Sequence, residues 1–329
     1  MKRDFSGPVK GAFARVLLML AAATLCASCS REQPDAGKPG HNAKVTLNGT
    51  SRFLEEVELA RGRHGETEPP AATPVLKWDF ANRDVHSYTY EQEVRNKTDM
   101  GSPVGGKSIL DNMGQEMSAK GMLLIKSEGD GTAELVLKDV AMIMKMDMGE
   151  GAPKTMEQKM PPVVMQGMKE DGSGPFGGSQ QDMLLKVLFP LPTKSLKVGD
   201  WCDVPAQMPF NAMGSVLEVK GRSRITLTRY VKIGNRTCAQ LDVDTDVSEL
   251  KVPSELKGEY KCSEKGTSVF YFDVANRSFV SGTIAIIMQF SIDAPTPEMK
   301  MSGEDTPDMP KRSKVSMASD NFIRVKLKE

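Results

Sequence analysis

The sequence predicts a mainly β protein in which an antiparallel sheet curves into a half-barrel. Apolar and polar residues alternate through Arg236–Val247, Val280–Ile292 and Met317–Leu327, which is the two-residue period of a β-strand. Each of these strands therefore has one apolar and one wet face, as strands of antiparallel sheets do. Parallel α/β sheets would instead show continuous Val/Ile runs between helices.

The segment Thr132–Met148 predicts the curvature. Leu135 and Leu137 mark its apolar face before Lys138–Asp139, and residues of the opposite parity mark that face afterwards. One extra residue in a strand produces this change, so we expect a β-bulge that bends the sheet. Long bent strands are typical of a curved sheet or half-barrel.

The N-terminus has the three parts of a bacterial lipoprotein signal. A basic head precedes an apolar core at Val16–Leu25, which is too short to span a bilayer, and small residues lead to Cys29. The thiolate of such a cysteine takes a diacylglyceryl group. Cys26 stands where leucine is usual, and an ordinary cleaved secretory signal is the alternative. We expect residues 1–28 to be the signal peptide and Cys29 to be the lipidated (palmitate-bearing) residue.

A lipid on Cys29 would anchor the mature chain to a membrane of the bacterial cell envelope. Ser30 rather than aspartate follows it, which favours the outer membrane over the inner by resemblance to the enterobacterial sorting rule. Residues 29–74 are polar and rich in proline and glycine, so we expect a flexible tether. A short helix fits at Ser51–Arg61.

The β domain is expected over residues 75–329. Strands before about residue 149 (75–149) and after about residue 198 (198–329) form either two halves of one sheet or two similar β lobes. Between them, 150–197 reads as a short helical and glycine-rich insertion, with a helix in Lys154–Met168 broken by prolines and a flexible loop at Asp171–Gln181.

Composition argues against several classes of function. Basic and acidic residues are equal in number, 43 each, and removal of the basic leader leaves a slightly acidic chain, so no nucleic-acid partner is expected. The chain has no His-Glu-x-x-His or Gly-x-Ser-x-Gly motif and only 3 histidines. We expect a non-enzymatic protein without a cofactor.

Two motif matches have simpler explanations. Gly101–Ser108 spells a phosphate-binding loop, but Pro103 lies inside it and the preceding residues are too polar for a buried strand, so we expect a hairpin loop. Asp242–Asp246 resembles the start of a calcium loop. Val247 occupies the position of the required glycine, and alternating acids on the wet face of a strand explain the pattern.

The chain has 22 methionines, and several of them alternate along one expected strand face at Met142, Met144, Met146 and Met148. Three readings stay open: a sheet core, an adaptable apolar groove that binds a lipid or peptide, and a Cu(I) site built from thioethers. The residues that we expect to line such a groove are aromatic or methionine: Trp78, Tyr88, Tyr90, Met142, Met144, Met146 and Phe290.

Three cysteines follow the lipidation site, at Cys202, Cys238 and Cys262. An odd number permits at most one intramolecular disulfide in an oxidising compartment. We favour Cys238–Cys262, on neighbouring predicted strands. The alternative is that all three are small buried apolar residues.

Leu76-Lys-Trp78-Asp-Phe80 followed by Tyr88-Thr-Tyr90, and Phe189–Pro192 leading into Val198–Trp201, resemble uncharacterised bacterial lipoproteins of the DUF6263 type over roughly residues 75–295. That family carries no established catalytic residues, so the resemblance implies none. Curved-sheet lipoprotein carriers of the LolA-like group are compatible by architecture alone. The function expected is binding or scaffolding in the envelope, with an apolar ligand or an envelope protein as partner.

Overall fold

The computed structural model describes residues 50–101, 111–147, 153–175, 180–212, 215–252, 258–295 and 312–328. The signal peptide, Cys29, the first part of the expected tether and most of the Gly101–Ser108 loop lie outside these residues, as does Met148. No helix in the described ranges is long and apolar enough to cross a membrane.

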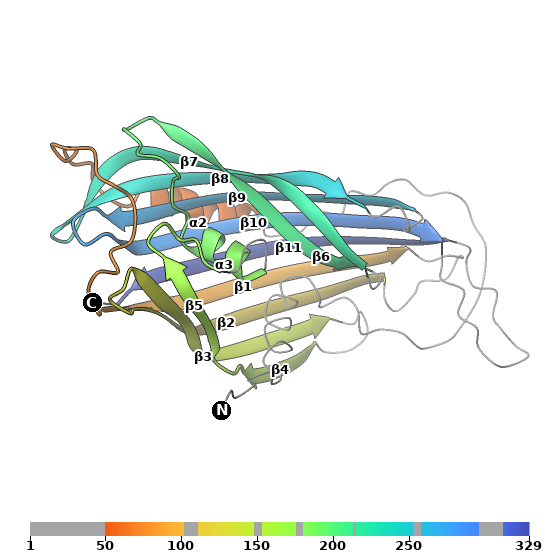
Figure 1. Ribbon diagram of the computed structural model, residues 1–329. Helices are drawn as coiled ribbons and strands as arrows, with labels where there is room; N and C mark the ends of the chain where they lie inside the picture. The colour runs from red at the N-terminus through yellow and green to blue at the C-terminus, as the bar shows by residue number, and fades with distance from the viewer. Residues whose placement is uncertain are drawn as a thin grey trace, which may run out of the picture.

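The described strands form one large antiparallel sheet that does not close into a barrel, as Figure 1 shows, so the predicted fold class is confirmed. Its order is β4-β3-β2-β1-β11-β10-β9-β8-β7-β6, and β5 pairs with β3 beside β4. The two expected halves are therefore parts of one sheet, joined where β1 pairs with β11. The strands are β1 (Val85–Gly101), β2 (Asp111–Ser127), β3 (Thr132–Asp147), β4 (Lys154–Lys159), β5 (Val163–Lys169), β6 (Trp201–Ala212), β7 (Ser215–Ile233), β8 (Arg236–Lys251), β9 (Glu259–Asp273), β10 (Ser278–Pro295) and β11 (Arg312–Leu327).

The sheet curls around a plug formed by α3 (Gln180–Leu188), the residues after it, and Leu76–Phe80. Leu135 on β3 and Leu227 on β7 belong to the same core cluster around this plug. Seven strand spacings separate β3 from β7, which is roughly 34 Å in a flat sheet. The sheet must therefore bend to bring both to one core, and Figure 1 shows α3 in front of the sheet and α2 behind it.

Aromatic side chains fill the plug. Trp78 stacks on Phe80 at 5.7 Å between ring centroids, and both rings are fully buried. Phe189 meets Trp78 edge-on at 5.4 Å, and Phe279 of the sheet lies 5.3 Å from Phe189. Rings at such distances and angles pack favourably beyond the area that they bury. This end of the sheet is a closed core.

The predicted bulge is present in β3. Its pairing with β2 shifts register between Lys120 and Met122, opposite Lys138 and Ala141, and Asp139 has a φ of 55°. A residue in this left-handed conformation leaves the ladder and turns the next side chain to the other parity. The phase change in the sequence is therefore a real inserted residue.

The predicted helix in Lys154–Met168 is wrong. This segment forms β4 and β5, which pair in line with the two halves of β3 on either side of its bulge. Pro161-Pro162 separates them, because proline lacks the N–H that a continuous strand would donate. The helix of the insertion is α3 instead, which begins at Gln180.

The expected tether does not extend as far as residue 74. Its helix forms as α2 (Thr50–Arg61), close to the predicted position, and docks on the sheet. Phe53, Val57 and Ala60 recur along one side of α2 and are buried against the strands, so the segment gains too much apolar contact to stay free. Beyond the helix, Glu66 pairs with Val231 as an isolated bridge.

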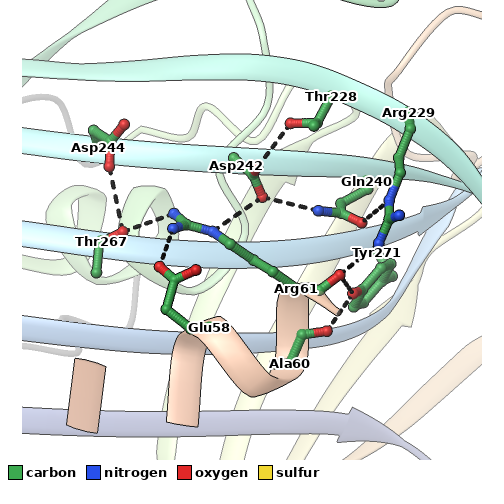
Figure 2. Close-up of polar contacts among 10 residues, drawn as sticks. All are labelled: Glu58, Ala60, Arg61, Thr228, Arg229, Gln240, Asp242, Asp244, Thr267 and Tyr271. Carbon is green, nitrogen blue, oxygen red and sulfur yellow. Dashed lines mark hydrogen bonds and ion pairs between the residues drawn. The ribbon is translucent and has the colours of Figure 1, made fainter. Parts of the chain in front are cut away.

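Polar contacts fix the C-terminal end of α2, as Figure 2 shows. Arg61 forms an ion pair with Asp242 and donates a hydrogen bond to Thr267, 2.7 Å away. Thr267 in turn donates to Asp244 at 3.3 Å. These carboxylates on the wet face of β8 thus serve to dock α2, which agrees with a strand rather than a calcium loop.

The predicted Cys238–Cys262 disulfide is wrong. Both cysteines, like Cys202, are free and buried. Cys238 pairs with Asp273 across β8 and β9, whereas Cys262 lies roughly 35 Å farther along β9 by strand rise and pairs with Phe290. A disulfide needs Cα atoms within about 7 Å. The alternative reading, three small buried apolar residues, describes the structure.

Candidate functional site

The face of the sheet that contacts α3 is called the inner face here, and the face that contacts α2 the outer face. One half of the inner face is covered by the closed core around Trp78 and Phe189. The other half extends from that core to the opposite ends of the strands. In that second half it carries two smaller apolar clusters and a set of polar residues. The arrangement of these residues follows from the strand register.

Glu264 lies on the inner face in the middle of β9. Inner positions on this strand are even-numbered, because Cys262, Phe270 and Phe272 all belong to inner clusters. Across the ladders, Glu264 pairs with Met288 on β10 and Val247 on β8. We call a set of residues that pair in this way from strand to strand a row. The row of Glu264 continues to Ser319 of β11 on one side and to Gly221 of β7 on the other.

The Glu264 side chain is buried, and no opposite charge lies beside it among the residues that the structure describes. The residue is 8% exposed, and burial raises the pKa of the carboxyl to about 7. Within the described ranges, no hydrogen bond or ion pair reaches this carboxyl. Its row from β6 to β3, and the next two rows toward the closed end, contain no other aspartate, glutamate, lysine or arginine. Lys154, at the β4 edge, is six strands away along the sheet.

Neutral polar residues surround Glu264 in a band across the inner face, here called the polar band. The hydroxyl oxygens of Ser223 and Thr245 lie 2.8 Å apart. Asn96 donates to Gln115 at 3.4 Å, while its own side-chain oxygen is buried without a partner in the described structure. The members of the polar band are Gln92, Asn96, Gln115, Ser223, Thr245, Glu264, Ser268, Ser319 and Asn321.

Next to Glu264, toward the far ends of the strands, lies an apolar patch, here called the far patch. Its residues come from five adjacent strands, β7 to β11, and from the described part of the chain only strand residues and the neighbouring Val252 pack against it. No described helix contacts it. Its buried members are Leu217, Val219, Val247, Cys262, Met288, Phe290, Ile292 and Met317.

The structure splits the seven residues that the sequence predicts for ligand contact. Trp78 and Tyr88 belong to the closed core, where Tyr88 donates a hydrogen bond to the carbonyl of Phe279 at 2.9 Å. Burial raises the pKa of Tyr88 well above its usual value. The Trp78 indole N–H is buried without a partner in the described structure. Neither side chain is positioned to touch a ligand.

Tyr90 lies at the border between the closed core and the polar band. Its hydroxyl donates to Gln92 at 2.8 Å, and Gln92 donates to Asn321 at 3.1 Å. This chain of bonds fixes the amide groups of two strands in one orientation. Phe290, by contrast, is a member of the far patch, two positions from Met288.

Met142, Met144 and Met146 face inward on β3, as their alternation predicts. Met142 is buried against Val94 and Met117, while Met144 and Met146 are half-buried. Met144 pairs with Met117 on β2 and with Met156 on β4, so three thioethers lie in one row across three strands. Met156 is 50% exposed.

Glu264 is the residue that sequence reasoning missed. The signal for it was present, because Glu264 has the same parity as Cys262, Phe270 and Phe272 on one strand. A carboxylate among inward-facing aromatic residues is more informative than any of the aromatic residues alone. Among the described histidines, aspartates, glutamates and cysteines, no group of three could hold a metal ion.

Comparison with known proteins places the chain in no family. No protein-family model matches it, and neither does any curated protein. Among solved structures, an alignment with the enduracididine biosynthesis enzyme MppR, complexed with the condensation product of pyruvate and imidazole 4-carboxaldehyde, covers 79% of this chain and 98% of that one, at 10% identity. Its TM-score of 0.09 carries no implication for fold or function.

Proposed function

We propose that this chain is a non-enzymatic binding protein of the bacterial cell envelope that holds an apolar ligand on the inner face of its sheet. The observation that carries the proposal is the division of that face into a closed aromatic core and a far patch bordered by the polar band. A core that serves stability alone gains nothing from an unpaired buried carboxyl, which costs several kcal/mol when ionised. A ligand that meets both surfaces would explain why they adjoin.

The side chains of the inner face are of the kinds that apolar binding sites contain. Apolar binding sites in proteins are concave, mostly apolar and supplied with a few fixed polar groups. The far patch supplies the apolar side chains, and the Tyr90–Gln92–Asn321 chain supplies oriented polar groups. Methionines on both sides, such as Met142 and Met288, adapt to varied apolar shapes.

The test is recovery of a ligand from the full chain. Protein purified from envelope membranes without detergent exchange is extracted with organic solvent, and the extract is analysed by mass spectrometry. We expect a stoichiometric apolar molecule, which is reduced in Phe290→Ala but retained in Ile287→Ala, since Ile287 lies on the same strand and faces outward. An empty extract, together with no binding of a displaceable fluorescent apolar probe, would contradict the proposal.

The envelope location rests on the N-terminal signal. In this proposal Cys29 carries the lipid and the outer membrane is its destination, and the resemblance to DUF6263-type lipoproteins points the same way. Labelled palmitate should enter the wild-type chain and Cys26→Ser but not Cys29→Ser. Palmitate in Cys29→Ser, or unlabelled wild-type protein in the cytosol, would contradict the anchor without touching the ligand site.

The motifs behind that resemblance have a structural explanation. Trp78, Phe80 and Phe189 are the rings that form the closed core around which the sheet curls. Sequences that share these motifs would share the plugged half-barrel, whatever they bind. The resemblance therefore supports a common architecture rather than a common ligand.

A second candidate function is Cu(I) binding, and the row Met117–Met144–Met156 favours it. Neighbouring side chains in such a row have Cβ atoms about 5 Å apart, so three thioether sulfurs can converge on one soft cation. Anaerobic Cu(I) titration against a competing chelator tests it. We expect sub-micromolar binding that is lost in the double variant Met144→Leu/Met156→Leu but kept in Met165→Leu, whose sulfur is buried in the closed core.

A further inference from the structure

Glu264 also limits the charge of the ligand. Its carboxyl is the one acidic or basic group in the three rows that cross the inner face from β6 to β3. Nearby titratable groups add no positive charge: Cys262, two positions along β9, has its pKa raised to about 12 by burial and by Glu264. An anionic group brought to this band would meet a like charge in a poorly solvated place, and the three described rows offer no arginine or lysine to receive it.

A cationic group would complete the site. An ammonium ion beside Glu264 gives the buried carboxylate the opposite charge that the described protein does not supply. It carries three N–H donors, and one carboxylate cannot accept all of them in a linear geometry. The polar band provides a further acceptor in Thr245, which lies on the adjacent strand one inner position from Val247, the partner of Glu264, with its hydroxyl 2.8 Å from that of Ser223.

The direction of the apolar part follows from the register. Cys262 on β9 and Phe290 on β10 pair directly, one inner position beyond the pair of Glu264 and Met288. On β11, Met317 pairs with Phe290 and extends the same surface. A chain that starts at Glu264 and runs along the strands therefore lies on the far patch, while the opposite direction is blocked by the aromatic plug.

We propose that the inner face binds single-chain amphiphiles with a cationic amine, with the ammonium group on Glu264 and the alkyl chain on the far patch. This inference rests on the proposed ligand-binding function and specifies its ligand class. Neutral amphiphiles of the same length bind the far patch alone and bind more weakly. Anionic amphiphiles bind weakest.

The pH dependence follows from the same geometry. The unliganded carboxyl has a pKa of about 7, so it is mostly protonated at pH 6 and mostly ionised at pH 8. An alkylamine stays protonated over that range, as lysine does. Its affinity should therefore rise from pH 6 to pH 8, whereas the affinity of an uncharged alcohol should stay constant.

Three probes with one chain length test the inference: dodecylamine, dodecan-1-ol and dodecanoate, each titrated into the full chain below its micellar concentration. We expect dodecylamine to bind about tenfold or more tighter than dodecan-1-ol at pH 8, which is the usual size of a charge-assisted contact. Glu264→Gln should remove that advantage and leave dodecan-1-ol unchanged. Glu259→Gln, on the exposed side of the same strand, should behave like the wild type.

The outcomes separate the inference from the proposal beneath it. Equal binding of dodecylamine and dodecan-1-ol at pH 8, or dodecylamine binding that Glu264→Gln does not weaken, overturns the cationic specificity and leaves an apolar site. Tightest binding of dodecanoate overturns it as well. If none of the three probes binds, both the cationic specificity and the proposed ligand-binding function are overturned. Circular dichroism and a thermal melt of Glu264→Gln exclude misfolding as the reason for any loss.

Discussion

The hydroxyl of Tyr271 donates a hydrogen bond to the backbone carbonyl of Ala60 across 2.5 Å, which ties β9 to the last turn of α2 (Figure 2). The last carbonyls of any helix lack intrahelical donors. Here the sheet supplies them, since Arg229 also donates to the carbonyl of Arg61 at 2.6 Å. The helix that precedes the β domain is thus bonded to the sheet as part of the fold.

Replacing Tyr271 by phenylalanine should destabilise the protein. The change keeps the ring against α2 but removes the side-chain donor to the Ala60 carbonyl, which then accepts only from the Arg63 N–H at 3.2 Å, at a cost of about 1 kcal/mol. Urea unfolding would show a lower midpoint with an unchanged slope, and limited proteolysis would cut after α2 more readily. Tyr260→Phe on the same strand is the control. Equal stability of Tyr271→Phe and wild type would mean that this contact contributes nothing.

Gly221→Ala should be among the most damaging single substitutions in the sheet. Gly221 lies where the pairing of β7 with β8 shifts register, and a Cβ there would stand 2.0 Å from the carbonyl oxygen of Asp246. Backbone must move to admit it, which we expect to cost about 2–3 kcal/mol. Gly65→Ala, where a Cβ meets nothing within 4 Å, serves as the control in the same thermal melt. Wild-type stability of Gly221→Ala would contradict this geometry.

The three described cysteines should behave as free, unreactive thiols. Burial raises the pKa of Cys238 and of Cys262 to about 12, so little thiolate exists at neutral pH. Ellman's reagent should label none of the three rapidly in native protein and all three in denaturant, and a reducing agent should not change the thermal stability. If two thiols stayed unlabelled in denaturant and became reactive after reduction, the predicted disulfide would be present after all.

The sequence was informative where a pattern is local. The bulge at Lys138–Asp139 changes the parity of apolar residues on one strand, so it was visible without any knowledge of partners. The helix expected in Lys154–Met168 was wrong where no such pattern marked the strands, because its methionines, from Met156 to Met168, recur every three to five residues rather than every two. Every side chain of β4 is exposed, so no burial pattern marked it as a strand.

Features that depend on which strands pair could not be predicted from the sequence. The order of the strands decides that Cys238 faces Asp273 and that Cys262 faces Phe290, and no spacing along the chain reveals this. The same is true of Glu264: the sequence shows which face of its strand it occupies, but its isolation from positive charge depends on residues of eight other strands. The aromatic residues near Trp78 looked like a binding surface because a plug and a pocket have the same composition.

Glu264 should also control how stability depends on pH. The pKa of its carboxyl is about 7 in the folded chain, against an ordinary value of 4.5 that the unfolded chain would have. Between these values the folded state holds a proton that the unfolded state has lost, so stability must fall as pH rises. The full difference, reached above pH 7, amounts to about 3 kcal/mol.

Glu264→Gln removes this titration and keeps the size of the side chain. Its stability relative to wild type, measured by urea unfolding at intervals from pH 5 to pH 8, should increase steadily with pH, because only the wild type acquires a buried charge. Groups common to both proteins cancel in the difference, so its slope reports the Glu264 carboxyl. A flat line would mean that this carboxyl is solvated or paired in the folded state. A cationic ligand would then find no unsatisfied carboxylate at Glu264, and a carboxylate that is already satisfied gains little from an ammonium ion.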